Sequence, residues 1–230
     1  MLFVADPVAA QDLGAFLPAG EGLATRSAQV IVLLTVLSLV PGLLMMVTCF
    51  PFVVTVLAIL RQAIGLQQSP PTMLLTTLAL FLTYFVMEPV FTQAWTAAIA
   101  PLEAGEITVD EALPRALEPF RTFMSGRIEP RTWQGLAELR GEPPVPDASA
   151  SLSVMVPAFL LSELSRAFQV GFVLFLPFLI IDLVVAAVLM SMGMMMVPPA
   201  IVSLPFKLAF FVVADGWTLI ATALVRGYIP

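Results

Sequence analysis

Charged and polar side chains that stand within long apolar runs are the first candidates for chemistry in this sequence. Four of them recur at steps of three and four residues, which places them on one face of a helix: Ser162, Glu163, Arg166 and Gln169. A lipid environment does not accept such a polar face, which must therefore contact protein or water. Two interpretations stay open: a Glu163–Arg166 pair within one helix that has no further role, or a contact between helices of an assembly.

Lys207, the only lysine of the chain, has apolar neighbours for many residues on both sides. Because an unpaired ammonium group at membrane depth is costly, a carboxylate partner is expected. The candidates are Glu163, Asp182 and Asp215. A structural ion pair is favoured over a site for a transported ion, because the sequence has no histidine for a proton relay and the apolar runs of its first half hold a single charge, Glu88.

Five methionines stand within seven consecutive residues, from Met190 to Met196. The run contains Gly193 and is followed closely by Pro198 and Pro199, which together indicate that a helix breaks here. Methionine is flexible and makes apolar contacts without strong hydrogen-bonding groups, so apolar filler and a compliant seal are both open. Transport of copper(I), which thioethers favour, is disfavoured because the supporting cysteines and histidines are missing.

Missing residue types exclude most classes of catalysis. Without histidine, the sequence cannot build a Ser–His–Asp triad, a Cys–His pair or an HExxH zinc site. Its single cysteine, Cys49, permits neither an intrachain disulfide nor a thiolate metal cluster, and we expect it to be a buried, inert thiol. The net charge of −6 argues against a nucleic-acid partner. We therefore expect no enzymatic activity, no catalytic residue, no cofactor and no metal.

Composition predicts helices that associate with a membrane. The chain has 230 residues, of which 60% are hydrophobic and 11% charged, whereas a soluble domain is roughly a quarter charged. Four apolar runs are long enough for membrane helices: 28–60, 72–100, 167–206 and 208–225. They lack the alternation of a membrane barrel. The predicted fold class is all-α, with two hydrophobic helical hairpins on either side of a polar helical segment.

Changes in composition divide the chain into four segments. They are an N-terminal extension (1–27), a first hydrophobic hairpin (28–102), a polar helical segment (103–151) and a second hydrophobic hairpin that holds the methionines (152–230). No signal peptide is visible in the first segment. The polar segment contains Thr108-Val-Asp-Glu111, which is typical of a capping box that opens a helix.

Prolines mark expected breaks in the first hairpin. Pro41 and Pro51 are expected to kink or break the first apolar run. The stretch from Gly65 to Pro71 reads as a turn, after which its two prolines start a new helix.

An ordered set of motifs in this sequence resembles the FliP/SctR family of type III secretion export-gate proteins. The motifs occur in the family's order: 60–65, 79–83, 157–172, 176–183, 192–199, 204–208 and 215–217. The likeness extends from about residue 28 to the end of the chain, and the ordered set is highly specific.

The resemblance implies a subunit of the flagellar protein-export gate, a multi-pass protein of the bacterial inner membrane within the flagellar basal body. Such subunits form a homo-oligomeric ring, expected to be a pentamer, together with FliQ and FliR and beside other membrane proteins of the export apparatus. Unfolded flagellar proteins pass through the ring. The energy comes from other components, which include an ATPase and the proton-motive force.

The resemblance also assigns roles to residues. The gate loop that it implies consists of Met192, Gly193, Met194, Met195, Met196, Pro198 and Pro199, with the methionines acting as a gasket. A buried ion pair joins Glu163 with Lys207, and the charged set expected to hold the assembly together also includes Arg166 and Asp182. The polar segment is expected outside the cytoplasm, although its five arginines favour the cytoplasm by the positive-inside rule.

Two alternatives remain at this point. A virulence-type secretion gate of the SctR kind would differ in its substrates rather than in its mechanism, and neighbouring genes would distinguish the two. A small-solute transporter would need inverted repeats and a polar site at the centre of the membrane. The first hairpin lacks counterparts of Glu163, Arg166 and Lys207, which disfavours the transporter.

Overall fold

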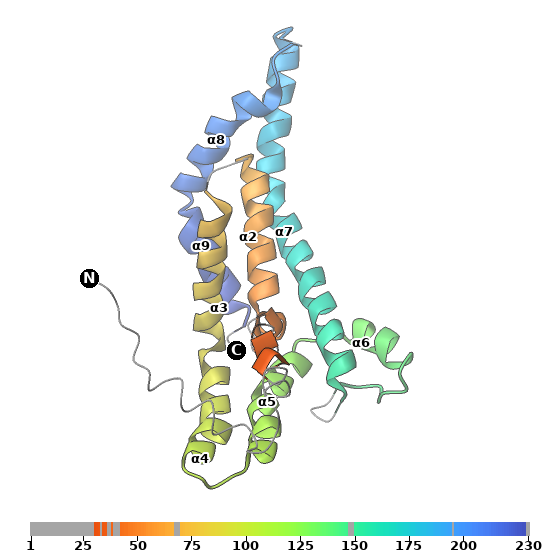
Figure 1. The fold of residues 1–230 in the computed structure, drawn as a ribbon. Coiled ribbons are helices and arrows are strands. Elements are labelled where there is room, and N and C mark those ends of the chain that lie inside the picture. The colour runs from red at the N-terminus through yellow and green to blue at the C-terminus, as the bar shows by residue number, and fades with distance from the viewer. Residues whose placement is uncertain are drawn as a thin grey trace, which may run out of the picture. The chain divides into compact units, whose positions relative to one another are not determined.

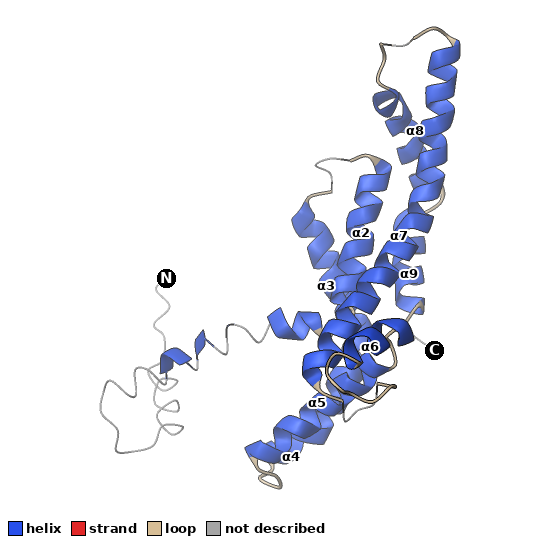
Figure 2. Cartoon of the chain, turned by 90° about the vertical axis from the view of Figure 1, so that its right-hand side faces the viewer, coloured by secondary structure: helices blue, strands red, loops and turns tan. Residues whose placement is uncertain are grey.

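The computed structural model describes residues 30–32, 34–35, 38, 42–66, 70–146, 150–194 and 196–228. The chain divides into two units, Met1–Leu44 and Met45–Pro230. The predicted N-terminal extension, 1–27, lies outside the described residues. Within the described ranges the regular structure is helical throughout and contains no strand (Figure 2), which confirms the all-α prediction.

Two helices of the second unit form the first hydrophobic hairpin: α2 (Phe50–Ile64) and α3 (Thr72–Ala94). The predicted break of the first apolar run lies at residues 47–49. Pro51 stands in the first turn of α2, where a backbone N–H would have no partner within the helix, so the N–H that proline lacks is not needed. Gly65, at φ +89°, ends α2 in the left-handed conformation that favours glycine. Pro41 lies outside the described residues.

The helical path of α3 continues beyond Ala94. A π-helical turn, η3 (Trp95–Ile99), leads directly into the short α4 (Ala100–Glu103). Together they make an apolar helical stretch from Thr72 to Glu103, which is 32 residues long.

The polar middle segment folds as α5 (Val109–Ser125) and α6 (Pro130–Ala137). The predicted capping box opens α5: the backbone N–H of Thr108 donates to a carboxylate oxygen of Glu111 at 3.2 Å. The indole of Trp133 is fully buried, and its Nε1–H donates to the carbonyl oxygen of Pro143 at 2.9 Å. The proline-rich stretch after α6 is thereby tied to the buried indole.

A small apolar core joins this middle segment to the beginning of the next helix. Met124 and Trp133 from the middle segment pack with Met155 and Phe159. A second and larger core lies among the hydrophobic helices around α2. The middle segment is therefore folded onto the helical body through apolar contacts of its own.

The second hydrophobic hairpin begins with α7 (Leu152–Ser191), a single helix of 40 residues. At 1.5 Å per residue it is about 60 Å long, which is twice the roughly 30 Å of a bilayer core. The chain then returns through α8 (Pro199–Val213) and α9 (Gly216–Arg226), which are bent by 62° at their junction. Half of α7 at most can therefore lie within the hydrocarbon layer if the helix stands along the membrane normal.

Helix α2 lies between α3 and α7 (Figures 1 and 2), and it contacts both. The approach to α7 is closest at Gly171, where an added Cβ would come within 2.5 Å of the Cδ1 atom of Ile59. Glycine is therefore required at this crossing, because any side chain would force the two helices apart. This contact fixes the first hairpin against the second.

By length and composition, two of the described helices can cross a membrane: Thr72–Glu103 and Leu152–Ser191. The bent pair of α8 and α9 would make a third if it counts as one broken span. These helices agree with the predicted membrane-associated hairpins.

Candidate functional site

The methionine-rich loop begins where α7 ends. Gly193 adopts φ +74° and its N–H donates to the carbonyl of Met190 at 3.1 Å, while the N–H of Met194 donates to the carbonyl of Leu189 at 3.0 Å. This pair of bonds is the Schellman motif, which satisfies the last carbonyls of a helix and turns the chain out of it. The glycine therefore stops α7 at a defined residue.

The other end of the loop is set by the two prolines. Pro198 precedes α8 in an extended conformation and Pro199 is its first residue. Proline is favoured at the first position of a helix, where no backbone N–H is needed. The helix break predicted from Gly193 and the two prolines is confirmed.

The described methionines of this loop are solvent-accessible in the single chain. Met196 is 97% exposed, Met192 is 67% exposed and Met194 is 42% exposed. Met195, the remaining methionine of the predicted gate loop, lies outside the described residues. The thioether side chains at the tip of the second hairpin are therefore available for contacts beyond this chain.

An apolar groove of about 590 Å³ runs between α7 and α8 directly behind the loop. Val188 and Met192 line it from the α7 side, Met194 lines it from the loop, and Phe206 lines it from α8. All the described residues of its lining are apolar. The loop is thus attached to two helices that leave space between their apolar side chains.

At the end of the groove that lies away from the methionine loop, a charged network joins α7 to α8. The Nζ atom of Lys207 lies 2.6 Å from the Oδ2 atom of Asp182, and the hydroxyl of Ser203 donates to the Oδ1 atom of the same carboxylate at 2.6 Å. The ammonium group also donates to the carbonyl oxygen of Ala63 at 3.1 Å, near the end of α2. The network therefore connects three helices below the methionine loop.

A second charged cluster lies nearer the beginning of α7. Glu163 is fully buried, and its Oε1 atom accepts from Arg127 at 3.2 Å and from Arg166 at 3.0 Å. The hydroxyl of Tyr228 donates to the other carboxylate oxygen, Oε2. Two cations and a phenol thus satisfy one buried carboxylate, as a buried charge requires.

Arg127 holds this cluster to the segment that follows α9. Its guanidinium lies 3.9 Å from the centre of the Tyr228 ring and donates to the carbonyl oxygen of Gly227 at 2.8 Å. Burial and the neighbouring Glu163 carboxylate raise the pKa of Tyr228 well above its usual range. The phenol therefore keeps its proton and acts as a hydrogen-bond donor.

Within the single chain Lys207 does not pair with Glu163, and the predicted Glu163–Lys207 pair could form only between subunits of an assembly, where it stays a prediction. Asp182 is the partner of Lys207, and 19 residues of α7 separate it from Glu163. That separation is about 28 Å along the helix, too far for a side-chain contact. The Glu163–Arg166 pair that the helical spacing suggested is present.

Three residues of these clusters escaped the sequence-based reading: Arg127, Ser203 and Tyr228. Arg127 precedes Glu163 by 36 residues and Tyr228 follows it by 65, so no helical period links them. Ser203 stands four residues before Lys207 on α8, and this spacing is the signal that places the two side chains on one helical face.

Other candidates for chemistry are few among the described residues. They contain no group of three or more His, Cys, Asp or Glu side chains arranged to hold a metal ion. Cys49 is fully buried, so the predicted burial of its thiol is confirmed.

Comparison with known proteins gives one consistent result. The FliP family matches residues 33–224. Three relatives named flagellar biosynthetic protein FliP are similar over most of the chain. The protein of Caulobacter vibrioides is 50% identical over 91% of this chain and 79% of its own length. The Bacillus subtilis protein is 45% identical over 89% of this chain and 93% of its own length. The Pectobacterium carotovorum protein is 44% identical over 99% of this chain and 90% of its own length.

Proposed function

The chain belongs to the FliP family of flagellar biosynthetic proteins, which are components of the flagellar export apparatus. We propose that it is a structural and gating subunit of the export gate. In this proposal several copies form a ring, a pentamer, with FliQ and FliR. Unfolded flagellar proteins cross the inner membrane through it. The subunit is a conduit without catalytic activity, and other components, which include an ATPase and the proton-motive force, drive export.

The observation that carries this proposal is the form of the methionine loop. It leaves α7 at Gly193 through a Schellman motif and joins α8 at Pro199, so its residues cannot be absorbed into either helix. Met196 in this loop is almost entirely exposed. Copies of such a loop arranged around a ring would place thioether side chains at one level of the pore.

Methionine suits a closure that must also let a polypeptide pass. Its unbranched side chain has three rotatable bonds, makes apolar contacts and adapts to irregular shapes. Apolar constrictions resist wetting, so they exclude hydrated ions without a rigid plug. The apolar groove behind the loop offers room into which Met192 and Met194 can shift when a chain passes.

The gate function is tested by replacing Met194, Met195 and Met196 together with Ala. Assembly is expected to persist, because Met194 and Met196 are exposed in the single chain. The gasket, however, would be lost, and cells should become permeable to small ions and solutes. The measurement is ion leakage at matched abundance of the assembled complex.

Two matched variants control this experiment. Replacement of the same three methionines with Leu keeps the apolar bulk and is expected to preserve the seal while slowing export. Met73→Ala removes another highly exposed methionine, at the start of α3, and is expected to have no effect on leakage. If cells with the Ala triple variant leak no more ions than wild-type cells, the methionines serve only in packing and do not seal the pore.

Exposed apolar side chains support a ring of several subunits. Phe81 and Phe85 on α3, and Phe172 and Leu183 on α7, are more than half exposed in the single chain. Apolar patches of this kind mark protein–protein or membrane contacts. Copurification of FliQ and FliR with the tagged chain, and the mass of the intact complex, test the partners and the pentamer.

We propose that the polar segment, 103–151, lies outside the cytoplasm. The family resemblance implies this side, and we give it more weight than the positive-inside rule, by which the five arginines of the segment favour the cytoplasm. Cysteine at the exposed Glu106, in a Cys49→Ala background, tests this placement. An impermeant thiol reagent added from the extracytoplasmic side should label it in cells whose inner membrane is intact. Labelling that requires a permeabilised inner membrane would contradict the placement.

The relatives also bear on the choice between flagellar and virulence secretion. All three relatives described above are named flagellar proteins. We therefore propose flagellar proteins as the substrates, and loss of flagella on deletion of the gene, without loss of other secretion, tests this.

A further inference from the structure

A cavity at the turn between α2 and α3 is not used by the gate proposed above. Its volume is about 550 Å³, within the roughly 300–1,000 Å³ that ligand sites typically have. The last turns of α2 and the first turn of α3 line it, and Ala200 borders it from α8. The cavity therefore lies where the helical stretch Thr72–Glu103, a candidate membrane span, begins.

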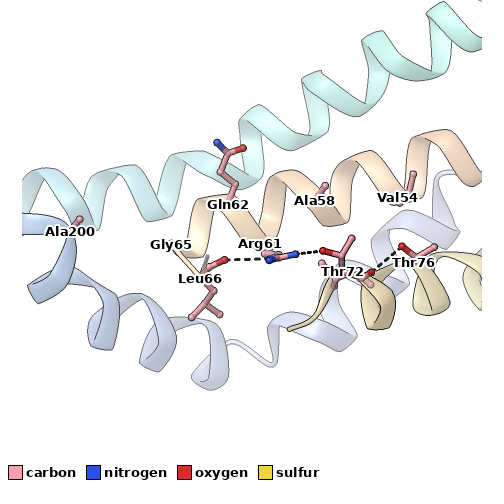
Figure 3. Close-up of a pocket in the computed structure, with 10 residues that line it drawn as sticks. Val54, Ala58, Arg61, Gln62, Gly65, Leu66, Thr72, Thr76 and Ala200 are labelled. Atoms are coloured by element: carbon pink, nitrogen blue, oxygen red, sulfur yellow. Dashed lines mark hydrogen bonds between the residues drawn. The ribbon is translucent and has the colours of Figure 1, made fainter. Parts of the chain in front are cut away.

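Arg61 provides a fixed positive charge at this cavity (Figure 3). Its Nε–H donates to the carbonyl oxygen of Leu66 at 3.4 Å, and one terminal nitrogen donates to the hydroxyl of Thr72 at 2.8 Å. These bonds hold the guanidinium between the end of α2 and the start of α3. The planar group is thereby oriented before a ligand arrives, which lowers the entropic cost of binding.

The beginning of α3 strengthens the positive potential at the same edge. Thr72 is the first residue of this 23-residue helix, so the positive end of the helix dipole lies beside the guanidinium. The described residues that line the cavity include Arg61 and no acidic side chain. An anionic group is therefore favoured there.

The lining of the cavity changes character away from the turn. Arg61 and Thr72 lie near the turn, whereas the lining farther along the hairpin is mainly apolar, with Val54 and Ala58 on α2 and Leu75 on α3. Thr76, which also lines this part, donates its hydroxyl to the carbonyl oxygen of Thr72 at 3.0 Å. The charged edge thus coincides with the beginning of the candidate span, and the apolar part lies along it. This gradient matches an amphiphile whose anion stays at the membrane surface.

We infer that this cavity binds an anionic phospholipid. The phosphate contacts Arg61 and Thr72, and the upper part of an acyl chain lies along Val54, Ala58 and Leu75. A free phosphate would satisfy only the polar edge, so the apolar lining favours the lipid. A zwitterionic lipid has a phosphate as well, but its cationic choline would stand close to the guanidinium.

The binding test uses the full chain in a neutral detergent, supplied with phosphatidylglycerol or with phosphatidylcholine of the same acyl chains. Native mass spectrometry then measures how many lipid molecules each chain retains. We expect one phosphatidylglycerol per chain, retained at least tenfold more strongly than phosphatidylcholine. Glycerol phosphate, which has the anion without acyl chains, should not displace it at equal concentration.

Variants assign the retained lipid to this cavity. Arg61→Gln removes a charge-assisted contact, and phosphatidylglycerol retention should fall roughly tenfold. Arg115→Gln, which removes an exposed arginine on α5, is the matched control and should retain the lipid as the wild type does. Ala58→Phe keeps the charge of Arg61 and fills the apolar part, so it should also lower retention.

Four results would overturn the inference. They are equal retention of the two lipids, equal loss in Arg61→Gln and Arg115→Gln, full retention in Ala58→Phe, and displacement of the lipid by glycerol phosphate at equal concentration. The last would show that the cavity takes the free anion. Lipid retention and ion leakage are separate measurements, so failure of this inference can be distinguished from failure of the proposed gate.

Discussion

The two carboxylates of α7 have different surroundings although they belong to one helix. Glu163 is fully buried and receives hydrogen bonds from two arginines and a tyrosine. Asp182 keeps 32% of its side chain exposed and pairs with one lysine and one serine. One cluster is therefore closed within the chain, and the other remains open on one side.

This difference separates a structural role from a positioning role. The Glu163 cluster joins the polar segment, α7 and the segment after α9, so it holds together parts that are distant in the sequence. The Asp182 cluster joins α7 to α8 below the methionine loop, so it sets the spacing of the two helices that hold the loop. Loss of the first should affect folding, and loss of the second should affect the loop.

The largest effect is expected for Glu163→Ala. Two guanidinium groups would lose their buried partner, and removal of one member of a buried pair typically costs about 3–5 kcal/mol. Thermal unfolding of the purified chain, together with its yield in membranes, measures this loss. A variant that keeps the wild-type melting temperature would show that Arg127 and Arg166 find other partners, and the closed character of this cluster would be refuted.

A smaller loss, about 2–3 kcal/mol, is expected for Lys207→Ala, because Asp182 is partly exposed and water can solvate it. The double exchange Asp182→Lys with Lys207→Asp should restore part of the stability and of the recovery of the proposed complex with FliQ and FliR. The exchange Glu163→Lys with Lys207→Glu should restore neither. Rescue by the second exchange would mean that Glu163 is the partner of Lys207 after all, across subunits.

Tyr228→Phe removes one hydrogen bond to Glu163 and keeps the aromatic ring beside Arg127. The expected loss is about 1–2 kcal/mol, since a hydrogen bond to a charged group contributes roughly 1.5–3 kcal/mol and two arginines remain. Faster proteolysis after Arg226 would report a loosened end of α9. Unchanged melting and unchanged proteolysis would show that the phenol is dispensable.

The smallest effect is expected for Arg166→Gln. Its side chain is 37% exposed, so water replaces much of the lost interaction, and the expected loss of stability is below about 1 kcal/mol. The same substitution at Arg127, whose side chain is 18% exposed, should cost more, because it also removes the contacts with Tyr228 and Gly227. Equal melting temperatures for the two variants would contradict this order.

Local signals predicted the elements well. The end of α7 followed from Gly193 and the two prolines, and the start of α5 followed from Thr108 and Glu111, because each depends on residues within one or two turns. The apolar runs gave the hairpins and the fold class. A composition-based reading can reach these features because helices are stabilised by neighbours along the chain.

Partners across the chain were harder to predict. Lys207 had three possible carboxylates, and the choice of Asp182 over Glu163 depends on how far α8 returns along α7, which the sequence does not state. The cavity at Arg61 likewise depends on the angle between α2 and α3. Pro157 and Pro177 lie inside α7 without ending it, so proline in an apolar run marked a boundary in some places and not in others.

The position of Tyr228 in the chain gives the Glu163 cluster an order of completion during synthesis. Arg127 is made before Glu163 and Arg166 follows within one helical turn, whereas the tyrosine comes 65 residues later. At roughly 5–20 residues per second, a ribosome needs about 3–13 s for that interval. Throughout it, two cations surround one carboxylate on a nascent chain whose last two helices have not yet emerged. The docking of those helices is therefore the step that completes the cluster, and a chain stalled before it would leave the Oε2 atom of Glu163 without its phenol donor.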